Sequence, residues 1–252
     1  MNYLIGDIGN TSLKICKINN KFRIVKTFLF RTKSVYLEKN LKKKINQLAK
    51  NNTCNKILFS SVVPHIYRKI DKIFRKKNFK IFEIKKFGLN KLLKFKVKRY
   101  SQLGSDRIAN AIGAYYKFKT NCIVIDFGTA TTFDVIKKPG MYDGGVITPG
   151  IALSIENLFS STALLPTFKL KKYPTNYGKN TKEALNSGFF WGYQGLINNI
   201  VKKIIKKNNK NFKIILTGGY SNFFKDKIFK QATIEKDITI QGILKVYRKF
   251  LI

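Results

Sequence analysis

Two short segments of this chain repeat one pattern, in which an apolar run leads to an aspartate and then to a glycine turn. The first copy is Ile5-Gly6-Asp7-Ile8-Gly9-Asn10-Thr11, and the second is Val124-Ile125-Asp126-Phe127-Gly128-Thr129-Ala130. The two aspartates lie 119 residues apart in a chain of 252 residues, close to half its length. A β-type run follows each turn and can return beside the first as a hairpin. The repetition predicts two similar lobes whose Asp-Gly turns face one cleft.

Apolar spacing along the chain predicts an α/β protein with both kinds of element in each half. In the first half we expect strands at 3–5, 13–18, 23–30, 56–63 and 79–84, and helices at 41–48, 66–74 and 105–118. In the second half we expect strands at 122–126, 131–136, 144–147 and 212–216, and helices at 153–159 and 182–207. Gly188, Gly192 and Gly195 are expected to interrupt the last of these helices. The predicted domains are residues 1–118 and 119–252.

Composition excludes several classes of protein. An apolar content of 44% with 13% aromatic residues can build a core, which argues against disorder. Three cysteines without a Cys-x-x-Cys pair, and a single histidine, exclude a zinc finger and argue against a disulfide scaffold. We see no apolar run near the ~20 residues that cross a bilayer, and no signal-peptide pattern at the start. We therefore expect a reduced, cytoplasmic protein without a membrane partner.

The net charge of +37 comes from 50 basic and 13 acidic residues and permits two interpretations. A strongly basic chain is typical of nucleic-acid binding. However, the excess is mostly lysine, is spread along the whole chain, and accompanies many Asn, Ile and Phe residues, which share A/T-rich codons. Genome base composition explains this without a polyanionic partner, and we favour that explanation. In both cases the charge should attract anionic substrates at low salt.

The turn that follows Asp7 has the residue types of a phosphate-binding loop. Gly9 lets backbone N–H groups approach phosphate oxygens, and Asn10 and Thr11 add short hydrogen-bonding side chains. Asp7 itself can hold Mg²⁺ through its oxygens, directly or through water. An ordinary hairpin turn favours the same residues for backbone reasons, so the single copy leaves both readings open.

The second copy favours phosphate binding. Asp126 leaves a fully apolar strand, where an unpartnered carboxylate is costly and a cation is a natural compensation. Thr129, Thr131 and Thr132 supply uncharged hydroxyls suited to phosphate oxygens, although threonine is also a good strand former.

A third element is Gly104-Ser105-Asp106-Arg107 at the start of a predicted helix. Ser105 can cap this helix, and Asp106 in its first turn is favoured by the helix dipole. Alternatively, Asp106 accepts a proton from a substrate hydroxyl while Arg107 binds a substrate anion.

The ordered set of motifs resembles type III pantothenate kinase, of the acetate/sugar kinase, heat-shock chaperone and actin superfamily. The set runs Asp7-x-Gly-Asn-Thr, Gly-Ser-Asp106-Arg107, Asp126-Phe-Gly-Thr-Ala-Thr, Asp143-Gly-Gly-Val-Ile-Thr-Pro-Gly150, Asn180-Thr181 and Thr217-Gly-Gly219. Each motif is weak alone, but the order is specific and spans nearly the whole chain. The resemblance implies two tandem ribonuclease-H-like lobes of the actin-like ATPase fold with a cleft between them. It also implies ATP-dependent phosphorylation of pantothenate, the first step of coenzyme A synthesis.

The resemblance also implies roles for individual residues. ATP would contact Thr129 and the first turn, namely Asp7, Ile8, Gly9, Asn10, Thr11, Ser12, Leu13 and Lys14. Asp106 would be the general base, and Gly104, Ser105, Asp106 and Arg107 would line the pantothenate pocket. Asp126 would bind K⁺ or NH₄⁺, which the family needs besides Mg²⁺. Thr181 aligns with a threonine that reaches substrate near a homodimer interface, and it is also a candidate N-cap for the helix after it.

The chain departs from the family pattern before Gly104. Val97 stands where the family has a substrate-contacting tyrosine, and Tyr100 is a candidate substitute. Two rival functions remain at this point: another small-molecule kinase or polyphosphate hydrolase of the superfamily, and a basic nucleic-acid-binding regulator. The second rival requires none of the motif aspartates, so we expect no specific nucleic-acid partner.

Overall fold

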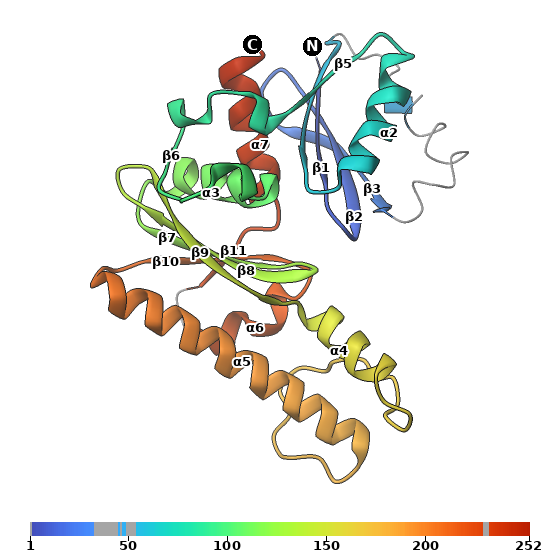
Figure 1. Ribbon diagram of the computed structural model, residues 1–252, viewed down its shortest axis with the longest axis vertical. Coiled ribbons are helices and arrows are strands. Elements are labelled where there is room, and N and C mark those ends of the chain that lie inside the picture. The colour runs from blue at the N-terminus through green and yellow to red at the C-terminus, as the bar shows by residue number, and fades with distance from the viewer. Residues whose placement is uncertain (1, 33–44, 46, 49–53, 229–231) are drawn as a thin grey trace. The chain divides into compact units, whose positions relative to one another are not determined.

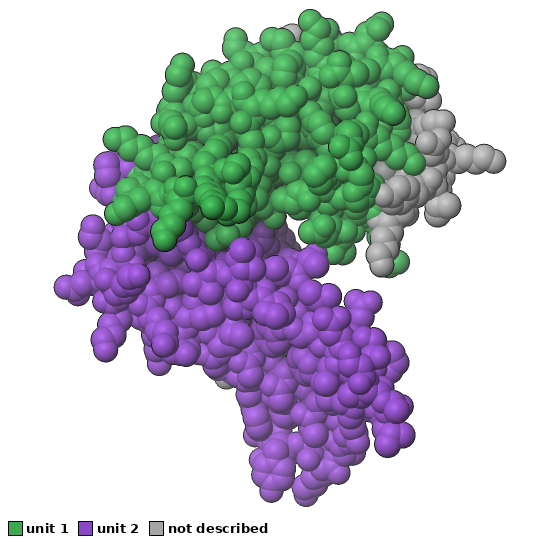
Figure 2. Space-filling model, viewed as in Figure 1, with its two compact units in different colours: residues 1–118, 140–142, 237–252 green, residues 119–139, 143–236 purple. Residues whose placement is uncertain are grey.

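The structure is a computed structural model that describes residues 2–32, 45, 47–48, 54–228 and 232–252 (Figure 1). It divides the chain into two compact units (Figure 2). Unit 1 comprises Met1–Phe118, Gly140–Tyr142 and Asp237–Ile252, and unit 2 comprises Lys119–Pro139 and Asp143–Lys236. The helix expected at residues 41–48 lies largely outside the described residues.

Unit 1 is built on a five-stranded sheet of order β3-β2-β1-β4-β5. β1 (Tyr3–Ile8), β2 (Ser12–Ile18) and β3 (Ile24–Arg31) form an antiparallel meander. β4 (Lys56–Ser61) and β5 (Lys80–Glu83) lie on the other side of β1 and run parallel to it. Because parallel strands end at the same edge of a sheet, the last residues of β1, β4 and β5 share one edge.

Three α-helices within the described part of unit 1 complete this framework. α2 (Pro64–Arg75) connects β4 to β5 and begins at a proline, which suits the first turn of a helix. Its buried Phe74 packs against Phe59 of β4, with ring centroids 6.5 Å apart. α3 (Ser105–Phe118) and α7 (Ile238–Phe250) pack against each other and against β1 and β4. Short 3-10 turns lie between β5 and α3, at Ile84–Lys86 (η2), Leu89–Lys91 (η3) and Tyr100–Gln102 (η4).

α7 belongs to the same compact unit as the N-terminal part of the chain. The sequence assigned every residue after 118 to the second domain, whereas Asp237–Ile252 belongs to unit 1. The reason is a close crossing of α7 over α3, at which both helices carry glycine. A Cβ on Gly242 would overlap the carbonyl oxygen of Ala109, and a Cβ on Gly113 would overlap that of Ile238. Only glycine allows two helix backbones to approach this closely.

The second sheet has the order β11-β10-β7-β8-β9-β6. β7 (Cys122–Phe127) and β8 (Ala130–Lys137) form an antiparallel hairpin, and β9 (Met141–Pro149) follows. β10 (Lys213–Gly218) pairs parallel with β7, and β11 (Thr233–Ile234) extends that side. The first residues of β9, which belong to unit 1, pair with β6 (Lys94–Phe95).

The duplicated sequence pattern corresponds to a duplicated sheet topology. In each unit the aspartate-bearing strand has an antiparallel hairpin partner on one side and a parallel strand on the other. In unit 1 Asp7 lies in register with Lys14 of β2 and Ser60 of β4. In unit 2 Asp126 lies in register with Thr132 of β8 and Thr217 of β10. Both aspartates are the penultimate residues of their strands.

Unit 2 carries three described helices, α4 (Ile151–Ser160), α5 (Thr181–Asn208) and α6 (Ser221–Ile228). The expected interruption of α5 by its glycines is wrong, because α5 is continuous over 28 residues. Its apolar side chains join the core that contains β7, through Phe190, Tyr193, Ile197 and Val201. Burial of this face offsets the low helix propensity of glycine, which costs roughly 1 kcal/mol per position.

Nowhere in the part of the chain that the structure describes is a helix long and apolar enough to cross a membrane.

Candidate functional site

The first Asp-Gly turn joins β1 to β2 and is held by backbone bonds. The N–H of Gly9 donates to Ser12 O (2.9 Å), and Thr32 closes the loop from the end of β3. Thr32 Oγ1 donates to Gly9 O (2.6 Å), and its N–H donates to Thr11 O (2.9 Å). These contacts leave Asn10 and Thr11 exposed at the tip of the turn, where a phosphate can approach.

The structure separates the eight predicted ATP-contacting residues of this turn into two groups. Ile8 and Leu13 are fully buried in the core, so they can offer only backbone atoms to a ligand. Asp7 and Lys14 lie side by side across the β1–β2 ladder. The Lys14 ammonium lies 3.3 Å from Asp237 Oδ1, at the residue before α7. Lys14 is therefore held at the turn, within unit 1, as a charge that can neutralise a phosphate.

The side chain of Asp7 also has a hydroxyl neighbour in register. Ser60 Oγ is fully buried and has no hydrogen-bond partner among the described residues. No group of three or more His, Cys, Asp or Glu side chains suited to a metal occurs in the described ranges. Mg²⁺ usually takes one or two carboxylates and completes its shell with water and substrate phosphates, so a single carboxylate fits this ion.

The second turn, between β7 and β8, is built on close glycine contacts. Gly218 ends β10 at φ +84°, and a Cβ there would lie 2.6 Å from Phe127 O and 2.7 Å from Asp126 Oδ1. Gly150 is equally constrained, because a Cβ on it would overlap the carbonyl oxygen of Thr129. Thr129 itself is exposed at the tip of the turn. The glycines leave a small cradle of carboxylate and carbonyl oxygens around Asp126, a donor set suited to a hard cation.

The Gly104-Ser105-Asp106-Arg107 element forms the start of α3, in unit 1. A Cβ on Gly104 would lie 2.5 Å from Asp106 Oδ1, so glycine lets the carboxylate lie close to the preceding loop. The N–H of Arg107 donates to Asp106 Oδ1 (2.8 Å). Burial raises the pKa of Asp106, and the backbone N–H and charge of Arg107 lower it. The net rise makes Asp106 a stronger base than an exposed aspartate.

Contacts inside unit 1 bring the first turn and the α3 element to the same sheet edge. The N–H of Val62 donates to Ile8 O (3.0 Å), at the end of β1. Val62 Cγ1 would be 3.6 Å from a Cβ on Gly104. The loop after β4 therefore touches both elements. Asp126, Thr129 and Thr181 belong to unit 2.

Thr181 does not cap α5, which corrects one of the two roles considered for it. The cap is Asn180, whose side-chain oxygen accepts from the N–H of Glu183 (3.0 Å), and Thr181 is the first helical residue. Thr181 is exposed and lines a groove between α4 and α5.

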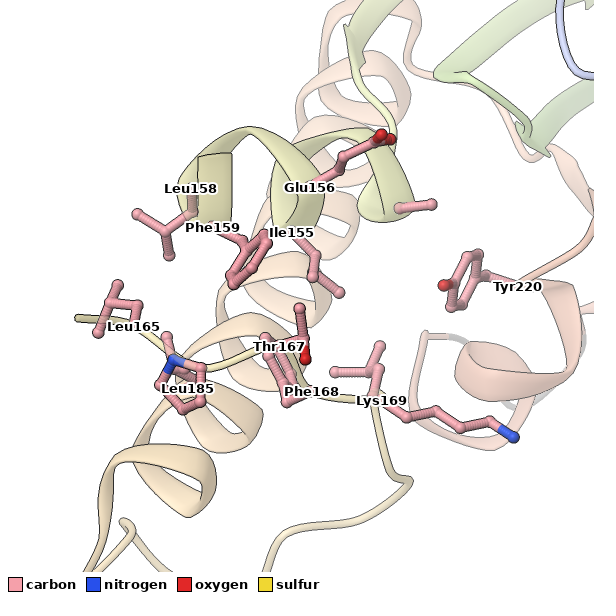
Figure 3. Close-up of a pocket in the computed structure, with 13 residues that line it drawn as sticks. Ile155, Glu156, Leu158, Phe159, Leu165, Thr167, Phe168, Lys169, Leu185 and Tyr220 are labelled. Atoms are coloured by element: carbon pink, nitrogen blue, oxygen red, sulfur yellow. The ribbon is translucent and has the colours of Figure 1, made fainter. Parts of the chain in front are cut away.

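Unit 2 also holds an apolar cavity of about 320 Å³, lined mainly by α4 and residues 165–170. Figure 3 shows Ile155 and Phe159 of α4 on one side and Phe168 on the other, with Tyr220 set apart from them. Tyr220 directly follows Gly219, whose N–H donates to Phe127 O (3.1 Å). Tyr220 is therefore the lining residue that lies next to this contact with β7.

Sequence reasoning missed the residues that fix these turns from distant strands. Thr32 lies 23 residues from Gly9, and Asp237 lies 223 residues from Lys14. Neither residue belongs to a motif, so no local signal identifies it. Glu83 was missed for the same reason, although its carboxylate bonds Ser105.

Comparisons with known proteins agree on one family. A sequence model of type III pantothenate kinase matches residues 3–203 of this chain. A type III pantothenate kinase from Pelagibacter ubique (strain HTCC1062) is 48% identical over 244 residues, covering 96% of this chain and 97% of that protein. Another, from Desulfosudis oleivorans (strain DSM 6200 / JCM 39069 / Hxd3), is 34% identical over 247 residues, covering 95% and 96%.

Solved structures support the fold independently. A Baf family protein from Campylobacter jejuni matches with a TM-score of 0.62 at 23% identity, over 98% of each chain. The activator of 2-hydroxyisocaproyl-CoA dehydratase from Clostridium difficile, solved with ADPNP, matches with a TM-score of 0.56 at 9% identity, over 99% of this chain and 95% of that one. At such identities the likeness shows the fold alone, which is the expected actin-like ATPase and sugar kinase fold. Since the family model covers most of the sequence and the two relatives cover nearly all of it, the chain belongs to the type III pantothenate kinase family.

Proposed function

We propose that this chain transfers the γ-phosphoryl group of ATP to the primary hydroxyl of pantothenate, forming 4′-phosphopantothenate in the first step of coenzyme A synthesis. Family membership supports the substrates. The observation that carries the chemistry is the half-buried carboxylate of Asp106 at the start of α3, whose pKa is raised by desolvation.

In this proposal Asp106 is the general base. Its carboxylate accepts the proton of the pantothenate hydroxyl while the hydroxyl oxygen forms a bond to the γ-phosphorus. The bond between that phosphorus and the β–γ bridging oxygen breaks, and ADP leaves. Arg107 would bind the pantothenate carboxylate, and Gly104 and Ser105 would line the pocket.

ATP would lie against the two Asp-Gly turns. Backbone N–H groups of residues 8–13, with the side chains of Asn10, Thr11, Ser12 and Lys14, would contact its phosphates from the first turn. Thr129 would contact them from the second turn. The apolar cavity beside Tyr220 is a candidate site for the adenosine moiety, because it has aromatic and aliphatic walls and Tyr220 follows the Gly218-Gly219 turn.

Two kinds of cation complete the proposed site. Asp7 would hold the Mg²⁺ of Mg-ATP, directly or through water, with Ser60 Oγ as a neighbouring oxygen. Asp126, in its glycine-lined cradle of oxygens, would hold K⁺ or NH₄⁺. These ions would supply positive charge beside the triphosphate.

We also propose that the enzyme is a homodimer formed through the α4–α5 groove. This groove is largely apolar, and Gly188 and Gly192 flatten one wall of it. Nearby Leu164 is 93% exposed. A second copy seated on this face would cover these residues and would place Thr181 at the interface.

An arginine at position 188 tests the dimer, because it puts a charge into the apolar groove. We expect Gly188→Arg to sediment as a monomer and the wild type as a dimer. Gly195→Arg, outside the groove, is the matched control and should remain dimeric. A wild-type chain that sediments as a monomer at micromolar concentration would refute the proposed assembly.

We infer a cytoplasmic location for the enzyme. Its three cysteines, Cys16, Cys54 and Cys122, are buried thiols, as expected in a reducing compartment.

The decisive experiment measures ATP-dependent phosphorylation of pantothenate by the purified chain, with and without K⁺. Turnover of pantothenate that rises with K⁺ is the expected result. A panel that includes sugars and polyphosphate tests the other activities of the superfamily. If one of these substrates is used and pantothenate is not, the proposed function is wrong.

A further inference from the structure

Glu83, at the end of β5, joins three elements of unit 1 through one carboxylate. Its Oε1 accepts from Ser105 Oγ (2.5 Å), at the first residue of α3. Its Oε2 accepts from the backbone N–H of Lys85 (2.7 Å), in the turn η2. The backbone of Ser61, at the end of β4, also hydrogen-bonds the carboxylate. The start of α3 is thus tied to the carboxyl edge of the sheet.

Lys85 holds the loop before α3 from the same turn. Its ammonium donates to the carbonyl oxygens of Ser101 (2.8 Å) and Leu103 (3.0 Å). The ammonium also lies 5.9 Å from the ring centroid of Tyr100, within cation–π range. Residues 100–103 lead directly into Gly104 and Ser105, so Glu83 and Lys85 hold the same segment from its two ends.

The position of Ser105 makes this arrangement relevant to the chemistry. Ser105 is 2% exposed, and it immediately precedes Asp106 in the helix. Its single hydroxyl proton is donated to Glu83, so it is not available to a substrate. A carboxylate held near a helix N-terminus is also favoured by the helix dipole. The bond therefore fixes the backbone that carries the base.

We propose that Glu83 and Lys85 are positioning residues that set the first turn of α3, so that the Asp106 carboxylate meets the substrate hydroxyl in one orientation. The inference rests on the proposed function, in which Asp106 is the general base. In this view the Ser105 hydroxyl acts through Glu83 and donates no hydrogen bond to pantothenate, even where Ser105 lines the pocket. Misplacing a catalytic group by about 1 Å can cost on the order of a hundredfold in rate.

The main test is a double-mutant cycle with Glu83→Gln, Ser105→Ala and the double variant. In Glu83→Gln the side-chain amide can no longer accept hydrogen bonds at both ends, and in Ser105→Ala the hydroxyl is absent. We expect each single variant to lower kcat by about ten- to a hundredfold while KM for ATP stays within about twofold of the wild type. The double variant should be no slower than the slower single variant, because both changes remove the same interaction.

The same change made in the Asp106→Ala variant distinguishes an effect on the position of the base from a general loss of folded structure. In Asp106→Ala the base is absent, so adding Ser105→Ala should change the residual kcat by less than about twofold. A purely structural role predicts the same loss with and without Asp106, and that result would overturn the proposal.

Lys85 is tested against its exposed neighbour in the same turn. Lys85→Met should lower kcat, Lys85→Arg should restore most of it by donating to the same carbonyls, and Lys86→Met should behave as the wild type. Equal effects of Lys85→Met and Lys86→Met would contradict a specific role for Lys85.

Amide hydrogen exchange provides a readout that does not depend on turnover. We expect residues 101–107 to exchange faster in Glu83→Gln and Lys85→Met than in the wild type, and unchanged in Lys86→Met. If the wild type fails to phosphorylate pantothenate, the proposed function fails whatever the variants do. If it is active and the Glu83 and Ser105 variants keep kcat within about twofold and exchange normally, the positioning role is wrong.

Discussion

Burial makes the Asp106 carboxylate a stronger base, and it also lowers the stability of the folded protein when that carboxylate is ionised. Burial raises its pKa from the ordinary value of 3.8, and the charge of Arg107 only partly opposes that rise. A carboxyl with a higher pKa in the folded chain than in the unfolded chain binds more protons when folded. Stability therefore falls as pH increases from about 4 through the raised pKa. The proposed catalytic group should weaken the fold at neutral pH.

Replacement of Asp106 by asparagine should consequently separate activity from stability. We expect Asp106→Asn to lower kcat by about 10²- to 10⁴-fold, because an amide cannot accept the proton. The same variant should raise Tm at pH 7.5 by roughly 2 °C, the shift expected for a change near 1 kcal/mol in a chain of this size. Thermal unfolding at pH 7.5 and pH 4.5 checks this, since the gain should shrink at the lower pH. A gain that is the same at both pH values would show that the carboxylate is not destabilised by burial.

Gly218 is the residue on which the Asp126 cradle depends. Its φ of +84° disfavours any L side chain, and a Cβ would lie 2.6 Å from Phe127 O. We expect Gly218→Ala to lower the free energy of unfolding by about 2 kcal/mol or more and to weaken activation by K⁺. Urea denaturation and a K⁺ titration of kcat measure the two effects.

Gly128→Ala is the control for stability at this turn. A Cβ on Gly128 would lie at an ordinary 3.5 Å from Ala130 O. We therefore expect this variant to unfold close to the wild type. Equal unfolding curves for the Gly218 and Gly128 variants would contradict the steric argument.

Single residues also show how far the sequence predicts the site. Asp7, Asp106 and Asp126 lie in motifs whose local pattern is enough to single them out. Glu83 lies 22 residues from Ser105 and has no motif of its own, so only folding brings the pair together. Motif residues can be recognised in the sequence because their spacing is local. The residues that hold them in place, such as Glu83, lie far away along the chain and cannot be recognised in this way.

At the scale of elements, glycine is required for packing in one helix and is not required in another. In α7 Gly242 permits the crossing with Ala109 of α3, whereas in α5 a Cβ on Gly195 would meet nothing within 4 Å. The sequence shows both as glycines in helical patterns. It predicted breaks in α5 that do not exist, because propensity alone does not record which face of a helix is covered.

The two positions should respond in opposite directions to the same substitution. We expect Gly242→Ala to destabilise the protein by about 3 kcal/mol or more, because the methyl group meets backbone that cannot yield. Gly195→Ala should stabilise it by up to about 1 kcal/mol, through the higher helix propensity of alanine. Urea denaturation of both variants provides the measurement. Similar midpoints for the two would exclude a tight α3–α7 crossing.

At the scale of the whole molecule, charge should act on encounter with ATP and not on the chemical step. With a formal net charge of +37, the protein attracts the triphosphate over distances that salt shortens. We expect KM for ATP to rise several-fold between about 50 and 200 mM ionic strength, with kcat nearly constant. Choline chloride should supply the ionic strength at fixed K⁺, so that the K⁺ requirement does not change. If KM for ATP does not depend on salt, the net charge does not contribute to the capture of ATP.

The return of α7 to unit 1 has a consequence for synthesis on the ribosome. Unit 2 is encoded almost entirely between two parts of unit 1, so its residues leave the exit tunnel before unit 1 can be finished. Gly242 and Ile238 cannot meet α3 until the segment that follows unit 2 has left the tunnel. A chain that ends after residue 236 and has been released from the ribosome should therefore contain all of unit 2 while α3 still lacks its partner, and such a truncated product is a natural target for proteolysis.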